Sequence, residues 1–338
     1  MKHLLLFSCC SFFLFSACKK PEEKKKVVYT CSDLYGEIYP SSTNKIHDGC
    51  ENNIDDIPGS KSTVYISSKI LKKNNNGYIE ITGTCTGVAV TSRTILTAAH
   101  CFALIPSKDI ISITYEVKNS ANGSKSLNAT VKTNKLYTIN PFKNNDPNST
   151  YIPMGDIAIL TTTEPLSKIN ITPAIIAKNY QLGDRLVTIG FGQSNENNKK
   201  SGDIKRWTVT EIFKPEKKIE LNQEQFNHYN NIDNKYEINR SVIANIGDSF
   251  ISTKRLRGQT CNGDSGGGHF LIKNNNKTNE TVLLSLTQGI THVITGPVPM
   301  TDTNDDCSAQ QAVTTYIYPY LKWIEANLSP GEKLKILE

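Results

Sequence analysis

Three residues of this sequence have the types that nucleophilic catalysis by a hydroxyl group requires. Ser265 lies in the run Cys261–Gly267, which reads CNGDSGG, and the glycines on both sides of the serine permit a sharp turn. A serine hydroxyl becomes a strong nucleophile at neutral pH only when a base accepts its proton and an acceptor orients that base. His100 and Asp156 supply these two residue types. The chemistry that they predict together is acyl transfer through the serine oxygen.

Each of the three residues also has a plain structural interpretation. A histidine between small residues and a cysteine, as His100 is in LTAAHC, is commonly a core residue with its hydrogen bonds satisfied internally. The composition around Ser265 suits a simple turn, and an aspartate that opens an apolar strand, as Asp156 does, is commonly a loop residue. The presence of all three in one chain favours catalysis.

The turn around Ser265 also predicts a binding site for a developing negative charge. Glycines let the backbone amides of such a turn point outward. The amides of Gly263 and Ser265 are therefore expected to converge on a carbonyl oxygen as it becomes an anion.

Short apolar segments separated by polar runs predict a fold built from many strands. Strands are expected at Ser62–Ile66, Ile79–Thr82, Ile110–Val117, Asp156–Leu160, Arg185–Ile189 and Thr281–Leu286. Surface loops are expected at 72–77, 143–150, 193–200 and 273–280. Helices are expected at Glu216–Tyr229 and at Tyr318–Leu328, where Leu321, Ile324 and Leu328 share one face and Pro319 suits a first turn. This pattern favours an all-β antiparallel sandwich or barrel with a C-terminal α-helix.

The first residues predict export. Residues 1–17 join a basic start to an apolar run that is too short for a spanning helix, as in a signal peptide. Phe15–Cys18 resembles the bacterial lipobox, in which the cysteine is acylated after cleavage. Phe15 stands where leucine is usual, so an unmodified secreted protein is the alternative. We expect a lipid anchor on Cys18, at a bacterial outer membrane or cell surface.

The sequence then predicts four further regions. Residues 18–30 are expected to be a lipidated tether, since 19–26 (KKPEEKKK) hold no apolar residue, and 31–59 to be an N-terminal segment like a propeptide. The main domain is expected at 60–330 and a tail at 331–338. The formal net charge of +6 includes Lys2 and an excess of three positive charges in 19–26, which leaves +2 elsewhere. So small a charge does not predict nucleic acid as a partner.

The cysteines predict disulfides rather than a metal site. Of nine cysteines, Cys9 and Cys10 leave with the signal peptide and Cys18 carries the lipid. The six that remain allow fifteen pairings: Cys31, Cys50, Cys85, Cys101, Cys261 and Cys307. No CxxC or HxxxH spacing is present, and an exported chain meets an oxidising compartment. No metal and no cofactor are expected.

The motifs, in their order along the chain, resemble those of the chymotrypsin/trypsin family of serine endopeptidases. Gly83–Gly87 (GTCTG) precedes LTAAHC, and Gly155–Leu160 (GDIAIL), Val187–Gly192 (VTIGFG) and CNGDSGG follow before the expected C-terminal helix. The resemblance extends over residues 60–330. It implies two packed antiparallel six-stranded β-barrels with the active site in the cleft between them.

The resemblance also implies a role for each matched residue. It makes His100 the general base and acid, Asp156 the carboxylate that orients it, and Ser265 the nucleophile, with Gly263 and Ser265 as the oxyanion hole. It implies the disulfides Cys85–Cys101 and Cys261–Cys307, and it leaves Cys31 to pair with Cys50.

Activation is where the sequence departs from the family. Members of the family are activated when a new N-terminus, usually Ile or Val before a hydrophobic residue and two glycines, pairs with the aspartate beside the nucleophile, here Asp264. No such tetrapeptide precedes Cys85. Cleavage after Lys45 would free Ile46, although Ile46 lies further from Cys85 than the family pattern expects. The alternatives are that Asp264 finds another partner or that the enzyme is regulated differently.

The substrate pocket is the second departure. The resemblance places Gln259 at the pocket floor, Thr260 beside it, and Thr287 to Gly289 on the strand that pairs with the substrate backbone. A pocket for Lys or Arg needs a carboxylate at its floor, so cleavage after basic residues is not expected. Thr260 and the nearby His292 are residue types similar to those that line the polar pockets of glutamate-specific relatives. However, Leu286 stands where those relatives require a histidine.

The expected function is that of a serine endopeptidase that acts on protein or peptide substrates, with a proteinaceous inhibitor as a further expected partner. The alternative is a binding or adhesion module that keeps the fold and does not cut. An α/β-hydrolase esterase is disfavoured, because that class has the order Ser, Asp, His and this chain has His, Asp, Ser.

Overall fold

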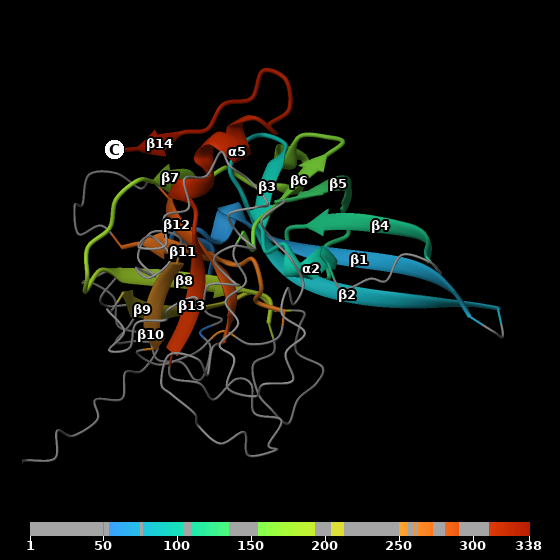
Figure 1. Ribbon diagram of the computed structural model, residues 1–338, viewed down its shortest axis with the longest axis horizontal. Coiled ribbons are helices and arrows are strands. Elements are labelled where there is room, and N and C mark those ends of the chain that lie inside the picture. The colour runs from blue at the N-terminus through green and yellow to red at the C-terminus, as the bar shows by residue number, and fades with distance from the viewer. Residues whose placement is uncertain are drawn as a thin grey trace, which may run out of the picture.

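The computed structural model describes residues 50, 54–74, 77–103, 110–134, 155–192, 204–212, 250–255, 260, 263–272, 281–290 and 311–338. Nearly all of the regular structure in these residues is β-strand, arranged as two packed bodies (Figure 1). The described residues include no helix that is long and apolar enough to span a membrane.

The first body is a closed antiparallel barrel of six strands in the order β1-β2-β3-β6-β5-β4. Its strands are β1 (Thr63–Asn74), β2 (Gly77–Ala89), β3 (Thr94–Thr97), β4 (Ile110–Lys118), β5 (Leu127–Thr133) and β6 (Ala158–Thr162). Branched apolar residues, which suit a pleated and half-buried surface, fill its interior, and Val64, Ile95 and Leu160 are fully buried there. The short helix α2 (His100–Ala103) follows β3.

In the part of the chain that the structure describes, the second body contains eight strands, six of which pair in a closed antiparallel ring. The ring follows the order β11-β8-β9-β10-β13-β12 and closes through the β11–β12 pairing. Its strands are β8 (Arg185–Gly190), β9 (Arg206–Ile212), β10 (Phe250–Arg255), β11 (Gly268–Leu271), β12 (Val282–Ile290) and β13 (Gln311–Tyr316). The predicted all-β fold of two packed barrels with a C-terminal helix is confirmed.

Two short parallel strands extend the second body beyond the ring. β7 (Ile175–Ala177) pairs with β12, and β14 (Ile336–Leu337) pairs with β7. β14 lies in residues 331–338, for which the sequence predicted only a tail. Glu332 reaches the first barrel, where its carboxylate accepts hydrogen bonds from Ser92 Oγ, Arg93 N and Thr94 Oγ1, each at 2.7 Å. Burial alone would raise the pKa of Glu332, but these hydrogen bonds outweigh it and lower the pKa.

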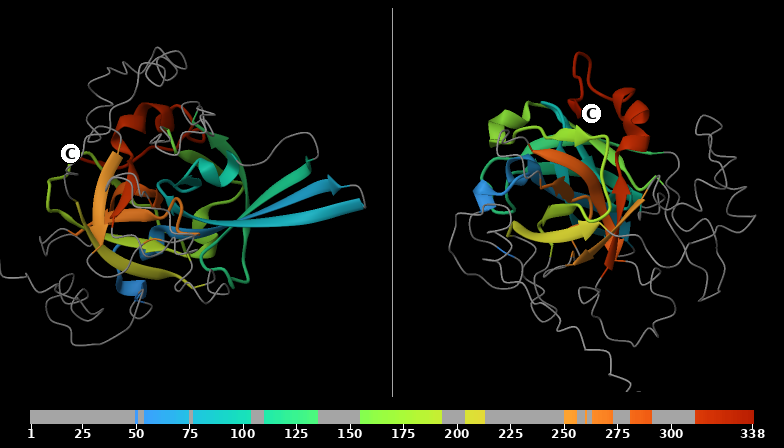
Figure 2. Two further views of the ribbon diagram at one scale, coloured as in Figure 1. Left: turned by 60° about the horizontal axis from the view of Figure 1, so that its bottom comes forward. Right: turned by 90° about the vertical axis from the view of Figure 1, so that its left-hand side faces the viewer.

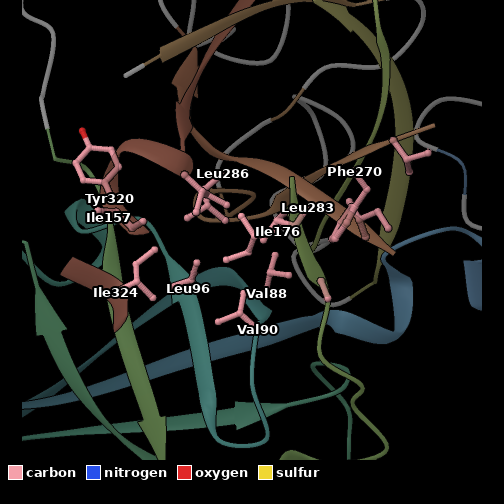
Figure 3. Close-up of a cluster of buried hydrophobic side chains, with 14 of the residues drawn as sticks. Val88, Val90, Leu96, Ile157, Ile176, Phe270, Leu283, Leu286, Tyr320 and Ile324 are labelled. Carbon is pink, nitrogen blue, oxygen red and sulfur yellow. The ribbon is translucent and has the colours of Figure 1, made fainter. Parts of the chain in front are cut away.

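A single apolar cluster joins the two bodies (Figure 3). Val88 on β2 and Leu96 on β3 pack in this cluster with Leu283 and Leu286 on β12, and all four side chains are fully buried. Ile324 of the C-terminal helix belongs to the same cluster. Because protein interiors are packed as densely as crystals, this contact fixes how the loops of one barrel face those of the other.

Several strands are longer than the sequence predicts. β1 continues to Asn74 and pairs with β2 as far as Asn74↔Gly77, so the expectation of a loop over 72–77 is wrong for residues 72–74 and for residue 77. The polar side chains of Lys72 and Lys73 do not end the strand, because their backbones pair with Ile79 and Tyr78 on β2. The loops expected at 143–150, 193–200 and 273–280 lie outside the described residues.

The helical segments are shorter than expected. Four short 3₁₀ turns lie within the described ranges: η1 (Ile54–Asp56), η2 (Ser60–Ser62), η4 (Leu166–Ile169) and η7 (Tyr318–Tyr320). The predicted helix Tyr318–Leu328 consists of η7 followed by α5 (Leu321–Glu325). After α5, Asn327 N donates a hydrogen bond to Ile324 O, three residues earlier, which is the pattern of a 3₁₀ turn. The helix predicted at Glu216–Tyr229 lies outside the described residues.

Candidate active site

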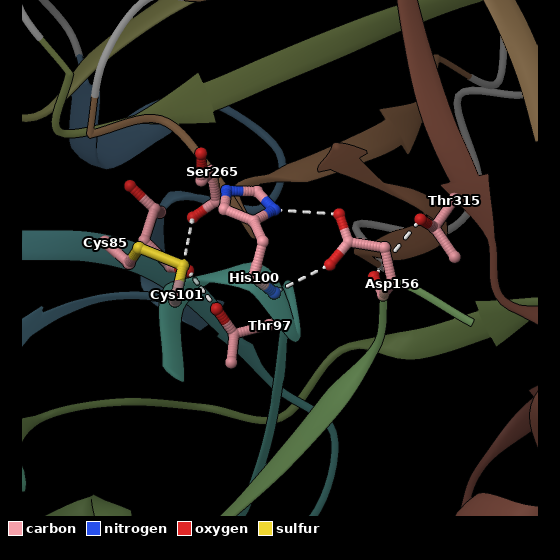
Figure 4. A network of polar contacts seen from close by, with 8 residues as sticks. Cys85, Thr97, His100, Cys101, Asp156, Ser265 and Thr315 are labelled. Atoms are coloured by element: carbon pink, nitrogen blue, oxygen red, sulfur yellow. Dashed lines mark hydrogen bonds and ion pairs between the residues drawn. A yellow bond between two sulfur atoms is a disulfide. The ribbon is translucent and has the colours of Figure 1, made fainter. Parts of the chain in front are cut away.

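The structure brings the three predicted catalytic residues to the boundary between the two barrels. His100 begins the helix that follows β3, Asp156 precedes β6, and Ser265 lies in the turn before β11 (Figure 4). The first two therefore come from the first barrel and the third comes from the second. Their relative position depends on the packing of the barrels rather than on closeness in sequence.

Asp156 holds His100 through two hydrogen bonds. One carboxylate oxygen, Oδ1, accepts the backbone N–H of His100 at 2.8 Å, and the other, Oδ2, lies 2.8 Å from the ring atom Nδ1. Asp156 is fully buried, and Thr315 Oγ1 donates to its backbone oxygen at 3.2 Å. The two bonds fix the plane of the imidazole and favour the tautomer with hydrogen on Nδ1, which leaves Nε2 free to accept a proton.

The basicity of His100 follows from the same contact. Burial alone would lower the pKa of His100, but the hydrogen bond to Asp156 and the negative charge of that carboxylate outweigh it and raise the pKa above 6.5. The side chain of His100 is 28% exposed, so the ring remains open to a bound molecule. A histidine in this environment can accept a proton from a neighbouring hydroxyl group.

Ser265 lies on the side of the imidazole away from Asp156 (Figure 4). Its backbone oxygen accepts a hydrogen bond from Thr86 N at 2.9 Å, and Cys101 Sγ lies 4.0 Å from the same oxygen. Within the described residues, the hydroxyl of Ser265 forms no hydrogen bond, including none to His100 Nε2. Such contacts are often long before a substrate binds.

Two glycines give the Ser265 turn its shape. Gly263 has φ of 98° and Gly266 has φ of 78°, a region that is costly for residues with a side chain. A Cβ atom on Gly266 would lie 2.1 Å from Thr97 Oγ1 and 2.4 Å from Thr86 O. The first barrel therefore packs directly against the turn, and only glycine fits at that position.

Thr86 on β2 is a residue of this site that sequence reasoning missed. Its hydroxyl donates to Gly263 O at 2.9 Å and accepts from Phe191 N at 3.1 Å. Together with the bond from Thr86 N to Ser265 O, these contacts tie the Ser265 turn to the first barrel and to the corner that follows β8. The only signal in the sequence was a threonine inside GTCTG, and threonine is common in strands.

The carboxyl group of Asp264 packs closely against two glycines, Gly190 and Gly192. Its Oδ1 accepts the backbone N–H of Gly192 at 2.6 Å. A Cβ atom on Gly190 or Gly192 would lie within 2.4 Å of the Asp264 carboxyl group, so a side chain at either position would displace it. Ile46, the predicted partner of Asp264 after cleavage, lies outside the described residues.

The disulfide predicted between Cys85 and Cys101 is confirmed, with a sulfur–sulfur distance of 2.02 Å. It links β2 to the helix that begins with His100. Cys50 is also disulfide-bonded, and its partner lies outside the described residues. The pairings Cys31–Cys50 and Cys261–Cys307 stay predictions, as does lipidation of Cys18.

The predicted pocket residues are described only in part. Gln259 and His292 lie outside the described residues. Thr260 is buried, and its hydroxyl has no hydrogen-bond partner among the described residues. Thr287 and Gly289 lie on β12, where Thr287 N donates to Gly267 O and Thr287 O accepts from Gly266 N. Thr287 therefore supports the Ser265 turn from the second barrel.

His269 is a buried residue that contacts Thr287 from the core of the second barrel. The ring of His269 is fully buried, with Nδ1 2.8 Å from Thr188 Oγ1 and Nε2 3.0 Å from Thr287 Oγ1. Burial lowers its pKa to about 3. The folded protein therefore holds this histidine neutral at pH values where the unfolded chain would protonate it.

This shift predicts that acid destabilises the protein through His269. Because the folded pKa lies below the unfolded value of 6.5, its contribution is complete above pH 6.5 and is lost as the pH falls toward 3. We expect the loss to be about 1.4 kcal/mol per pH unit below 6.5, and to be absent from His269→Gln. Urea unfolding of both proteins at pH 7, 6 and 5 measures the difference. Equal pH slopes in the two proteins would contradict it.

A sequence model of the trypsin family matches residues 69–324, which is most of the chain. The chain therefore belongs to the trypsin family. No curated protein matches it in sequence.

Solved structures with a similar fold include HL collagenase, at 16% identity over 83% of this chain and 98% of that chain, with a TM-score of 0.47. The scabies mite inactivated protease paralogue S-I1 matches at 15% identity over 83% and 98%, with a TM-score of 0.46. A structure described as GrC matches at 14% identity over 82% and 96%, also with a TM-score of 0.46.

Proposed function

We propose that this protein is a serine endopeptidase in which Ser265 is the nucleophile, His100 the general base and acid, and Asp156 the carboxylate that orients His100. The observation that carries the proposal is the double hydrogen bond from the buried Asp156 carboxylate to the backbone and ring of His100, with Ser265 beside the opposite edge of the ring. Family membership supports the same reaction class.

The proposed reaction forms and then hydrolyses an acyl-enzyme. Ser265 Oγ attacks the peptide carbonyl carbon while His100 Nε2 takes the hydroxyl proton, and the amides of Gly263 and Ser265 stabilise the oxygen anion. His100 then gives its proton to the leaving amine. Water, deprotonated by His100, attacks the ester, and the carboxylic acid product leaves as the serine regains its proton.

Asp156 contributes by stabilising the imidazolium that forms in both steps. Because the contact raises the pKa of His100, the group is a stronger base, although it is neutral and able to act only at pH values above that pKa. The rate is therefore expected to fall as the pH drops through this value.

The proposal includes export and anchoring by a lipid on Cys18, with residues 18–30 as the tether, at a bacterial outer membrane or cell surface. It rests on the apolar segment that precedes Cys18. Incorporation of an alkyne fatty acid into the wild-type protein and its loss in Cys18→Ser is the expected result. Equal labelling of both proteins would exclude this cysteine as the attachment site.

The substrate is proposed to be a protein or peptide, and a proteinaceous inhibitor would use the same surface. Gln259, Thr260, Thr287 and Gly289 are proposed to border the pocket, without a preference for Lys or Arg. Cleavage after Lys45 would activate the protein if Ile46 then pairs with Asp264. In the alternative, Asp264 stays with Gly192 N and no cleavage is needed.

The decisive experiment is labelling of residues 19–338 with a fluorophosphonate, which reacts only with an activated serine. Wild-type protein is expected to label, and Ser265→Ala and His100→Ala are expected not to. A sample cleaved after Lys45 is tested in parallel, since labelling of that sample alone would make Ile46 and Asp264 the switch. No labelling of either wild-type sample would replace the proposal with a non-catalytic binding module.

A further inference from the structure

A line of hydrogen-bonding side chains crosses four neighbouring strands of the second barrel. The strands are β9, β8, β11 and β12, which Figure 2 draws in colours from yellow-green to orange. Thr210 Oγ1 lies 3.3 Å from Thr188 Oγ1, and Thr188 Oγ1 lies 2.8 Å from His269 Nδ1. The other ring nitrogen, His269 Nε2, lies 3.0 Å from Thr287 Oγ1. All four side chains are buried, and we call them the buried polar line.

Apolar side chains would fill this space without the cost that the buried polar line carries. An imidazole and three hydroxyl groups lose their hydrogen bonds to water on folding, and the bonds among them only offset that loss. What such a network adds is a unique arrangement, because a shift of any member leaves a buried donor or acceptor without its partner. The line therefore holds β11 and β12 in one relative position.

Thr287, at one end of the line, lies where the pairing of strands is irregular. The register of β11 against β12 shifts between His269 and Phe270, and that of β12 against β13 shifts between Thr287 and Gly289. Such a shift interrupts the ladder of backbone hydrogen bonds and lets the strand bend. The bond between His269 Nε2 and Thr287 Oγ1 joins β11 to β12 between the two shifts. It therefore fixes a part of β12 where the backbone ladder is interrupted.

The backbone of Thr287 holds the turn that carries Ser265. Thr287 O accepts a hydrogen bond from Gly266 N at 2.8 Å, and Thr287 N donates one to Gly267 O at 2.7 Å. Gly267 N also donates to Asp264 O at 2.8 Å, which closes the turn around Ser265. Gly266 directly follows Ser265 in the chain, so a displaced Thr287 backbone would displace Ser265 as well.

We infer that His269 is a positioning residue for Ser265 and acts through its Nε2 edge and the backbone of Thr287. The inference rests on the proposed function, to which it adds a residue behind the catalytic groups. The Nδ1 edge, which contacts Thr188, is expected to contribute to stability alone. Burial lowers the pKa of His269 to about 3, so the same neutral ring makes both contacts at every pH at which labelling is measured.

Two substitutions of His269 separate the two edges of its ring. The side-chain amide of glutamine reaches about as far as Nε2, and that of the shorter asparagine about as far as Nδ1. Because an amide both donates and accepts, His269→Gln is expected to keep a bond to Thr287 and His269→Asn to keep one to Thr188 instead. The fluorophosphonate labelling rate is expected to stay within about threefold of wild type in His269→Gln and to fall about thirtyfold in His269→Asn.

Matched variants distinguish a loss of position from a loss of stability. His269→Gln and His269→Asn are expected to be destabilised to a similar extent, because each leaves one buried threonine hydroxyl without its partner. Thr188→Val removes the contact on the Nδ1 side, and is expected to lose thermal stability but to label within about threefold of the wild-type rate. Equal labelling rates in His269→Gln and His269→Asn would overturn the inference.

Thr287→Val tests the same contact with the histidine in place, and it also serves if His269→Asn does not fold. It is expected to label about thirtyfold more slowly than wild type, and the double variant His269→Asn/Thr287→Val no more slowly than either single variant, since both remove one bond. The midpoint of the pH profile is expected to match wild type throughout, because the contact between His100 and Asp156 is unchanged. A shifted midpoint, or losses that multiply in the double variant, would contradict positioning through Thr287.

Hydrogen exchange gives a readout that does not need catalysis. The amides of Gly266 and Gly267 donate the hydrogen bonds of the turn, and mass spectrometry of the peptic fragment that contains them measures their exchange. Exchange is expected to be about tenfold faster than wild type in His269→Asn and unchanged in His269→Gln and Thr188→Val. This result with a wild-type protein that does not label would keep the positioning contact and remove the proposed reaction. Equally fast exchange in His269→Asn and Thr188→Val would overturn the inference.

Discussion

Asp156→Asn is expected to lower the fluorophosphonate labelling rate at pH 7 by about ten-thousandfold. The carboxylate accepts from both His100 N and Nδ1, and an amide has one oxygen for these two donors. The amide nitrogen would donate to the ring and place the hydrogen of His100 on Nε2, where the base must be free. Loss of the negative charge would also lower the pKa of His100.

Labelling rates measured from pH 5 to 9 check both parts of this prediction. The variant is expected to lose amplitude at every pH, and the midpoint of its pH profile to shift downward. Thr315→Val is the matched control, because Thr315 bonds the backbone oxygen of Asp156 and leaves the carboxylate alone. A loss of less than tenfold in Asp156→Asn would show that the carboxylate does not set the tautomer of His100.

Thr86→Val is expected to lower the labelling rate by about a hundredfold, while Thr86→Ser stays within a few-fold of wild type. Valine keeps the shape of the buried side chain but leaves Gly263 O and Phe191 N without their partner. The turn that carries Ser265 and the Gly263 amide would then lose its tie to β2, and small displacements of reacting groups are costly.

Comparing the labelling rate of each Thr86 variant with its thermal stability distinguishes a loss of positioning of the Ser265 turn from a loss of folding. The thermal unfolding temperature of both variants is measured, and the labelling rate of His100→Ala gives the background rate to which theirs are compared. If Thr86→Ser loses as much activity as Thr86→Val, the hydroxyl does not position the turn. If both label at the wild-type rate, the bonds from Thr86 to Gly263 and Phe191 are not needed.

The motifs around His100, Asp156 and Ser265 could be recognised in the sequence because each is a run of small or apolar residues around one reactive side chain. The number and alternation of short apolar segments also predicted the all-β class. The pairing of strands could not be read in the same way, since a β-strand does not encode its neighbour locally. The extension of β1 through Lys72 and Lys73 was missed for this reason.

The residues that support the site were the harder part. Thr86 contacts Gly263, which is far from it in sequence. His269 contacts Thr287, which belongs to no distinguishing motif. A threonine in a strand and a histidine between Gly268 and Phe270 look like ordinary strand residues until the two barrels are packed together. Their function is a property of the tertiary fold.

The segment after the family match has a practical consequence for anyone who designs an expression boundary. The match ends at residue 324, but Glu332 binds the β2–β3 turn and β14 forms the outer partner of β7. A recombinant chain trimmed at residue 324 would expose the edge of β7 and leave Ser92 and Thr94 without their acceptor. An affinity tag or fluorescent reporter therefore belongs behind a flexible spacer after residue 338, so that it does not compete with β14 for its place in the sheet.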